Sequence, residues 1–333
     1  MYHTKIRLRL KTILVCSLPL LIFLGNSPIQ GQSLDIPTKK WGISFGNSKE
    51  FTGLRFNIQD HGVQQINGIN FTLWKPKEGN PDSVINGVSL GLMPGGGHLR
   101  GIQLGLAGAG AETSLKGISI GLLGVGAGGD VVGINISGIG AGAGGNMFGL
   151  NFGGLGVGAG EDLIGFNIGG LGCGAGRDMK GFNFGALGAG AGRDVYGLNI
   201  GGLGIGAGEN MIGINMGGLG VGAGEKLTGI NIGGLGCGAP EVTGISIGGL
   251  GVGGKYLKGI HLSAGTIITD KSGGVMTGLA VSSFNYIRGD QVGLSIGIVN
   301  YAWNVKGVQI GLVNIVRNNP QGLKVLPLFN TSF

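Results

Sequence analysis

The 333-residue sequence is poor in several residue types that most folded proteins use freely. Only 12% of its residues are charged and 6% are aromatic, and it contains 9 prolines and 3 cysteines. So few charges are inconsistent with a conventional globular protein that has a charged exterior. The scarcity of proline disfavours a collagen-like chain, and an apolar content of 42% disfavours a disordered tail.

Glycine is the residue that the sequence has in excess. The chain contains 80 glycines, about 24% of its length, which is roughly three times the usual share. Because the apolar content is also high, the chain is expected to pack. Glycine must then form much of its surface.

Residues 1–33 have the three parts of a secretory signal peptide. Four basic residues within the first 11 precede an apolar run over residues 12–24, and the small residues Gly31 and Ser33 follow. The run is too short to span a bilayer comfortably. We therefore expect export, with cleavage near Ser33. Loss of the four basic residues lowers the formal net charge from +7 to +3, so we expect no nucleic-acid partner.

Residues 101–258 form an internal repeat of about sixteen residues. Eight units have 16 residues and two have 15, and each begins with glycine, as in GLNFGGLGVGAGEDLI from Gly149. We number the positions of a unit 1 to 16 from that glycine. Residues 34–100 and 259–333 repeat less regularly, which favours terminal caps. The polar segment 75–84 predicts a loop.

The pattern within a unit predicts two short strands. Apolar residues occupy positions 2, 4, 7, 9, 11 and 15, and their alternation changes parity across the paired glycines at positions 5 and 6. A change of parity at glycines indicates a turn. We therefore predict strands at positions 1–5 and 7–11, with all six apolar positions pointing inward. A helix is disfavoured because each interior glycine would cost about 1 kcal/mol.

Two all-β architectures could use this unit. In a β-solenoid each unit is one coil of about 16 residues, and the coils stack at about 4.8 Å. In an outer-membrane β-barrel each unit is one strand with a bulge. The near identity of successive units favours the solenoid, because the two ends of a barrel differ. The parity of Leu323, Val325, Phe329 and Phe333 resembles the terminal strand of a barrel, so that alternative stays open.

Stacked coils align equivalent residues into columns, and position 3 is a column of asparagine. Because its neighbours at positions 2 and 4 are predicted to be inward, we expect it to point outward, where stacked amides can hydrogen-bond from coil to coil. Such a face could match a polysaccharide or a protein surface. This candidate surface ladder consists of Asn135, Asn151, Asn167, Asn183, Asn199, Asn215 and Asn231.

Position 14 is a polar column rich in carboxylates. Arg177 and Arg193 occupy position 13 beside it, so we expect solvated ion pairs at a turn. Calcium bound along the turns is the alternative, although calcium-binding β-rolls carry paired carboxylates in every turn. The column consists of Asp130, Asn146, Asp162, Asp178, Asp194, Asn210 and Lys226.

The remaining reactive residues do not predict an enzyme. Cys173 and Cys237 share the inward position 9 but lie four units apart, about 19 Å by stacking, which is too far for a disulfide. We expect both to be buried thiols. His61, His98 and His261 lack metal-ligand spacing. We expect no catalytic residues, cofactor or metal site other than the calcium alternative.

The less regular units resemble a known family. GLSIGIVNYA at Gly293, GVQIGLVNIV at Gly307 and the opening WGISFG are similar to the glycine-rich surface-repeat proteins of Leptospira and Bacteroidetes-type bacteria. The resemblance implies a secreted or outer-surface protein and brings no catalytic or binding residues with it. We therefore expect a noncatalytic structural or adhesive scaffold. A membrane-associated pore is the alternative if the fold is a barrel.

Overall fold

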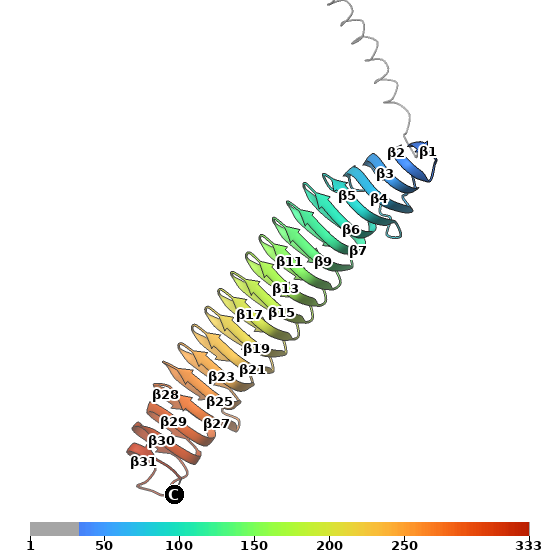
Figure 1. Ribbon diagram of the computed structural model, residues 1–333. Helices are drawn as coiled ribbons and strands as arrows, with labels where there is room; N and C mark the ends of the chain where they lie inside the picture. Colours follow the sequence, from blue (N-terminus) through green and yellow to red (C-terminus); the bar gives the residue numbers. More distant parts are fainter. Residues whose placement is uncertain (1–32, 333) are drawn as a thin grey trace, which may run out of the picture.

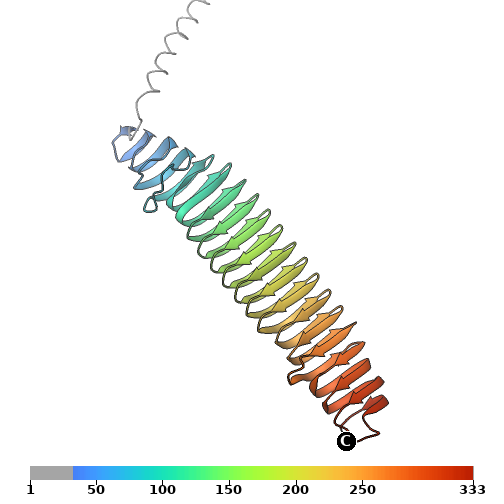
Figure 2. The same ribbon diagram turned by 180° about the vertical axis from the view of Figure 1, so that it is seen from behind.

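The chain forms an all-β solenoid. The computed structural model describes residues 33–332 and shows about 17 coils with about 16 residues in each. In two opposite views the coils stack along one nearly straight axis, from the blue N-terminal end to the red C-terminal end (Figures 1 and 2). The predicted solenoid is confirmed. Among residues 33–332, no helix is long and apolar enough to cross a membrane.

Neighbouring coils pair in parallel with a constant register. Asn151 lies opposite Asn167 on strands from successive coils, and Val157 lies opposite Cys173. The alternative of an antiparallel barrel is therefore wrong. The strands of the less regular N-terminal coils are β1 (Ser33–Pro37), β2 (Trp41–Gly46), β3 (Glu50–Gln59), β4 (Gln65–Trp74), β5 (Val84–Gly91), β6 (Gly95–Gly105) and β7 (Gly108–Gly121).

The regular coils alternate a longer strand with a short one. The short strands are β8 (Gly124–Ala127), β10 (Gly140–Ala143), β12 (Gly156–Ala159), β14 (Gly172–Ala175), β16 (Gly188–Ala191), β18 (Gly204–Ala207), β20 (Gly220–Ala223), β22 (Gly236–Gly238) and β24 (Gly251–Gly254). The longer strands are β9 (Asp130–Ser137), β11 (Met147–Gly153), β13 (Leu163–Gly169), β15 (Met179–Gly185), β17 (Val195–Gly201), β19 (Asn210–Gly217), β21 (Lys226–Gly233), β23 (Glu241–Gly248) and β25 (Tyr256–Ser263).

The C-terminal coils are again less regular, and both ends of the solenoid carry an antiparallel strand. β1 pairs antiparallel with β2, and β31 pairs antiparallel with β30. The predicted signal peptide lies outside the described residues except for Ser33, and Phe333 also lies outside them. The C-terminal strands are β26 (Thr266–Thr269), β27 (Gly274–Val281), β28 (Phe284–Tyr286), β29 (Gly289–Ala302), β30 (Asn304–Val316) and β31 (Val325–Asn330).

A regular coil differs from the predicted unit in where its strands begin. Its longer strand runs from position 14 or 15 to position 5 of the next unit, and its short strand covers positions 8–11, as in β11 and β12. A turn forms where it was predicted to within one residue, at positions 6 and 7 instead of 5 and 6. The glycine with positive φ, however, is at position 1, where Gly165 has a φ of 123°.

Position 1 requires glycine because successive coils touch there. A Cβ atom on Gly165 would lie 2.1 Å from the carbonyl oxygen of Gly149 in the preceding coil. No side chain fits at such a distance, and an L-residue is strained at this φ. This glycine lets the longer strand bend without losing its pairing to the neighbouring coils.

The inward positions are not those that the apolar pattern predicted. Positions 9 and 15 are buried, as expected, with Val157 3% and Leu163 0% exposed, and the alanines at position 11 pack against them. Positions 2, 4 and 7 point outward, and the asparagine column at position 3 points inward. The prediction was therefore wrong for three apolar columns and for the asparagine column.

The larger apolar side chains of positions 2 and 4 point outward because the interior of a 16-residue coil is narrow. Position 9 holds only alanine, valine, isoleucine and cysteine, whereas positions 2 and 4 hold four phenylalanines. Cys173 and Cys237 are free and buried, as predicted. Burial raises the pKa of both thiols to about 11.

Candidate functional site

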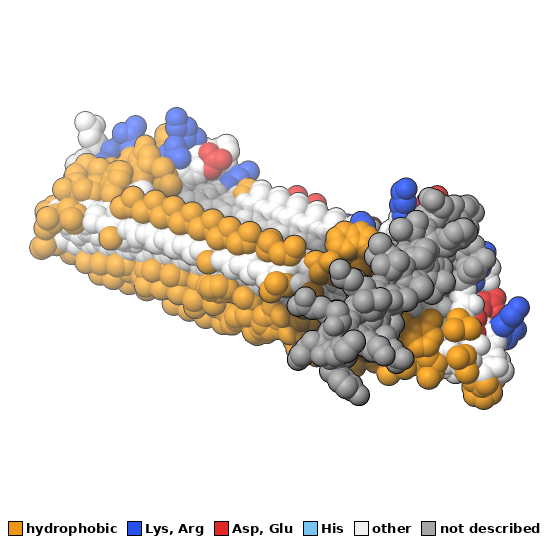
Figure 3. All heavy atoms as spheres, turned by 90° about the horizontal axis from the view of Figure 1, so that it is seen from above, with side chains coloured by type: hydrophobic (Ala, Val, Ile, Leu, Met, Phe, Trp, Pro, Cys, Tyr) orange, Lys and Arg blue, Asp and Glu red, His pale blue; other side chains and the backbone are white. Residues whose placement is uncertain are grey.

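The most prominent surface feature is an apolar face that follows the rod. It is formed by columns 2, 4 and 7 of residues 101–258, and we call it the apolar face. Figure 3 shows apolar side chains as orange bands that run lengthwise, with a white band between them. Phe166 and Phe182 stack across neighbouring coils of the face, with ring centroids 4.5 Å apart.

The three columns of the apolar face are uninterrupted by charge. Column 2 consists of Ile102, Ile118, Ile134, Leu150, Phe166, Phe182, Leu198, Ile214, Ile230 and Ile245. Column 4 consists of Leu104, Ile120, Ile136, Phe152, Ile168, Phe184, Ile200, Met216, Ile232 and Ile247. Column 7 consists of Ala107, Leu123, Ile139, Leu155, Leu171, Leu187, Leu203, Leu219, Leu235 and Leu250. The leucines of column 7 are the most exposed, with Leu187 and Leu203 both at 50%.

Apolar grooves lie at the N-terminal end of the apolar face and on the coils beyond its C-terminal end. At the N-terminal end a groove of about 860 Å³ lies between column 4 and raised leucines at position 6, including Leu106 and Leu122. At the C-terminal end a similar groove of about 510 Å³ is lined by Ile298 and Leu312. Between residues 138 and 249 position 6 is glycine in all units but one, so the middle of the face is flat.

The asparagine column forms a hydrogen-bonded ladder inside the solenoid. Each Nδ2 group from Asn135 to Asn215 donates to the Oδ1 atom of the asparagine in the next coil, at 2.8–2.9 Å. All seven side chains are 0% exposed. The coil-to-coil hydrogen bonds were predicted correctly, but the outward placement was wrong. The ladder therefore cannot present its amides to a polysaccharide or a protein.

His261 continues the same inner column beyond the ladder. It is 0% exposed, and neither ring nitrogen has a hydrogen-bond partner among the described residues. Its neighbours in the column are Ser246 and Ala280, neither of which carries a charge. Burial lowers the pKa of the imidazole to about 4, so the ring is neutral at pH 7.

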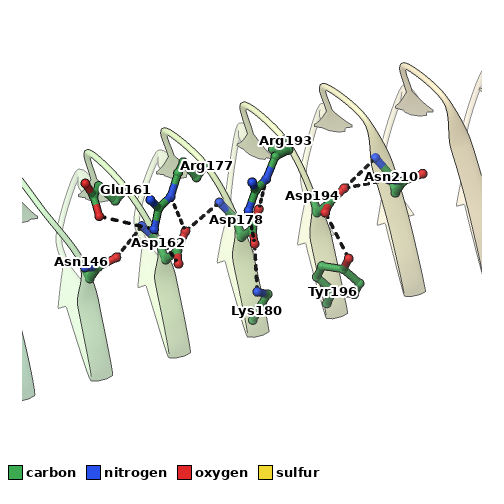
Figure 4. Close-up of polar contacts among 10 residues, drawn as sticks. All are labelled: Asn146, Glu161, Asp162, Arg177, Asp178, Lys180, Arg193, Asp194, Tyr196 and Asn210. Atoms are coloured by element: carbon green, nitrogen blue, oxygen red, sulfur yellow. Dashed lines mark hydrogen bonds and ion pairs between the residues drawn. The ribbon is translucent and has the colours of Figure 1, made fainter.

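The carboxylate-rich column at position 14 lies along a turn of the coil, and we call it the turn edge. Figure 4 shows its side chains bridging successive coils. Arg177 donates to Asp162 through Nε and Nη2, both at 3.1 Å. Arg193 contacts Asp178 in the same two-pronged way, at 2.8 and 2.9 Å. The predicted ion pairs at the turn are confirmed.

The turn edge satisfies its own carboxylates. The hydrogen bond from Arg193 is the main cause that holds the pKa of Asp178 well below its ordinary value, and Lys180 adds to it. The hydrogen bond from Arg177 likewise lowers the pKa of Asp162. Within residues 33–332, no group of three or more His, Cys, Asp or Glu side chains is placed to hold a metal ion.

The sequence contained a signal for the apolar face that pattern reasoning missed. Phenylalanine recurs at positions 2 and 4 but never at position 9 within residues 101–258. A narrow core accepts only a restricted range of volumes at each position. The tolerance of columns 2 and 4 for Ile, Leu, Met and Phe therefore indicates an outward orientation.

No family model, curated protein or solved structure matches this chain. The functional argument therefore depends on the geometry of the described residues. That geometry offers an extended apolar surface suited to noncovalent binding.

Proposed function

We propose that the protein is an exported, noncatalytic scaffold of the cell surface that binds a partner through its apolar face. The observation that carries this proposal is the length of columns 2, 4 and 7, which hold no charged residue over residues 101–258. Soluble monomers rarely expose apolar patches larger than about 300–600 Å². An apolar face that continues along the whole rod exceeds that size.

The estimated dimensions support binding over a long, flat contact. About 17 coils at roughly 4.8 Å each give a rod roughly 80 Å long. Columns 2 and 4 are about 7 Å apart along an extended strand, and column 7 lies beyond the paired glycines. Columns 2 and 4 stay apolar in register through the less regular coils, from Ile43 and Phe45 to Val308 and Ile310. With this continuation, an apolar face about 10 Å wide and 80 Å long offers about 800 Å², which is the area that one partner buries in a standard interface.

The signal-like N-terminus and the resemblance to bacterial surface-repeat proteins support the location that we propose. Export is tested by expressing the chain with its own N-terminus and treating intact cells with protease. We expect the protein to be digested on intact cells or to be recovered from the medium, without residues 1–33. Retention in the cytoplasm with those residues present would contradict the proposed location.

The binding role is tested with a charged variant of the apolar face. Leu187→Lys with Leu203→Lys adds two cations to column 7, where both side chains are half exposed. Asn146→Lys with Asn210→Lys is the matched control, because the next occupant of that column after Asn210 is Lys226. We expect the first pair to lower the amount retained on cells at least tenfold, and the control to have little effect. Equal retention of both variants would refute the binding role.

A further inference from the structure

The outer surface of the longer strands resembles a sheet face that lacks its covering layer. These strands pair only in parallel, and parallel sheets normally have both faces covered. Here the inner face holds the asparagine ladder, whereas the outer face holds columns 2 and 4. The inner face also carries the buried apolar column 15, so both faces of these strands are rich in apolar side chains and the outer one is left open to solvent.

Both ends of the rod are closed to the addition of further coils in parallel. β1 runs antiparallel to β2 and ends at Pro37, and β31 runs antiparallel to β30 and contains Pro327. Proline and reversed strands are common ways to prevent pairing at a sheet edge. The side of the rod therefore remains the surface for association.

The apolar face has a fixed period along the rod. Apolar side chains recur once per coil, in parallel ridges separated by the glycines of positions 5 and 6. A partner must repeat at the same spacing of about 4.8 Å to match such ridges over the whole length. A second copy of this chain has that period because it has the same coils. Its apolar ridges can lie over the glycines of positions 5 and 6.

The charges of the molecule do not oppose such a pairing. Columns 2, 4 and 7 carry none over residues 101–258. The ion pairs of Arg177 and Arg193 lie on the turn edge instead. Position 16 borders column 2 on the same outer surface and carries Lys116, Lys180 and Lys258, of which Lys180 is paired with Asp178. Two apolar faces can therefore meet with these lysines at the rim of the contact, where they stay in solvent.

We propose that the apolar face docks against the apolar face of a second copy, so that two rods lie side by side as a symmetric dimer. The two sheets would pack face to face at about 10 Å, and a two-fold axis across the rods closes the contact with the same residues on both partners. The estimated area of about 800 Å² on each partner equals that of a standard stable interface. This inference rests on the proposed binding role and names its partner.

The test is the mass of the purified exported chain in solution. Sedimentation equilibrium at about 10 µM should give twice the mass of one chain for the unmodified protein. The Leu187→Lys, Leu203→Lys variant should give the mass of a single chain, and the Asn146→Lys, Asn210→Lys control should remain dimeric. Circular dichroism should show the same strand content in all three proteins, because the four substituted positions lie on the surface or the turn edge.

Two outcomes would overturn the dimer. The unmodified chain could have the mass of a single copy, or the Leu187→Lys, Leu203→Lys variant could remain dimeric although folded. If the unmodified chain is a monomer that floats with phosphatidylethanolamine vesicles, and the Leu187→Lys, Leu203→Lys variant no longer floats with them, the apolar face binds lipid. In that last case the binding role would stand and the dimer would not. A monomer whose retention on cells is unaffected by the substitutions would refute both.

Discussion

The five inner members of the ladder, from Asn151 to Asn215, are each held between two identical residues in the coils on either side. Asn183 accepts a hydrogen bond from Asn167 and donates one to Asn199, both at 2.8 Å. A buried amide without partners costs free energy. The ladder largely avoids that cost because seven successive coils present the same donor and acceptor, and only the Oδ1 of Asn135 and the Nδ2 of Asn231 lack a partner among the described residues.

Removing one member of the ladder should be costly. Asn183→Ala leaves the Nδ2 of Asn167 and the Oδ1 of Asn199 without partners, so we expect a loss of about 2–4 kcal/mol in the free energy of unfolding. Asn210→Ala is the matched control, because its side chain is on the partly exposed turn edge, where we expect a loss of about 1 kcal/mol or less. Urea unfolding followed by circular dichroism measures both. Equal losses would show that the ladder is not buried.

His261 should make the stability depend on pH. Its pKa is lowered from 6.5 to about 4 in the folded chain by burial, so the unfolded chain binds the proton first as the pH falls. Stability should be constant above about pH 6.5 and decrease between pH 6.5 and about 4, by a total of ~3 kcal/mol.

The contribution of His261 is isolated with His261→Asn, which introduces the residue of the ladder in place of the imidazole. The variant should lose less stability than the unmodified chain when urea unfolding is compared at pH 7.5 and pH 4.5. Carboxylates such as Asp178 titrate in both proteins and cancel in the comparison. An identical pH dependence of the two chains would mean that the imidazole is not buried.

At the scale of the element, the glycine at position 1 of a regular coil combines a close contact between coils with a positive φ. A Cβ on Gly181 would lie 2.1 Å from the carbonyl oxygen of Gly165, at a φ of 114°. A Cβ on Gly206, at position 10 of its unit, would meet nothing within 4 Å. Abundant glycine thus has two different roles, close contact between coils and a bare outer surface.

The two roles predict opposite outcomes for the same substitution. Gly181→Ala should lower the free energy of unfolding by at least about 3 kcal/mol, because it combines a steric clash with an unfavourable φ. Gly206→Ala should change it by no more than about 0.5 kcal/mol. Thermal unfolding of the two variants compares them directly. A tolerated Gly181→Ala would be incompatible with the contact at position 1.

The turn edge should be indifferent to calcium. The carboxylates of Asp162 and Asp178 are already held by arginine side chains. We therefore expect the same Tm in millimolar calcium and in chelator. A rise of several degrees with calcium would instead support the alternative that the sequence left open.

The sequence predicted the elements of the coil better than their orientation. The 16-residue period, the two strands and a turn within one residue of the paired glycines follow from glycine placement, which is local chemistry. Orientation depends on the width of the interior, which no single unit reveals. In a single unit, asparagine at position 3 is expected on the surface, because nothing else in the unit can hydrogen-bond its amide. In the stacked coils the asparagines of the neighbouring coils supply those hydrogen bonds, so the side chain can be buried.

At the scale of the whole molecule, the rod is amphipathic across its width rather than along its length. In the view of Figure 3 the orange bands run along one side, while blue and red side chains gather at the upper edge and toward the ends. Small-angle X-ray scattering should give the same length of roughly 80 Å for the dimer and for the Leu187→Lys, Leu203→Lys monomer, with a thicker cross-section for the dimer. A doubled length would indicate association through the ends instead.

The central claim is that the asparagines of position 3 form a buried ladder inside the solenoid, whereas the apolar columns 2, 4 and 7 lie on its outside. It is tested most directly by hydrogen exchange of the asparagine side chains in protein labelled with ¹⁵N-asparagine and transferred to D₂O. We predict that the NH₂ groups from Asn135 to Asn215 in the ladder remain visible long after those of Asn146 and Asn210 have exchanged. Exchange of all these groups at the rate of free amides would contradict the account.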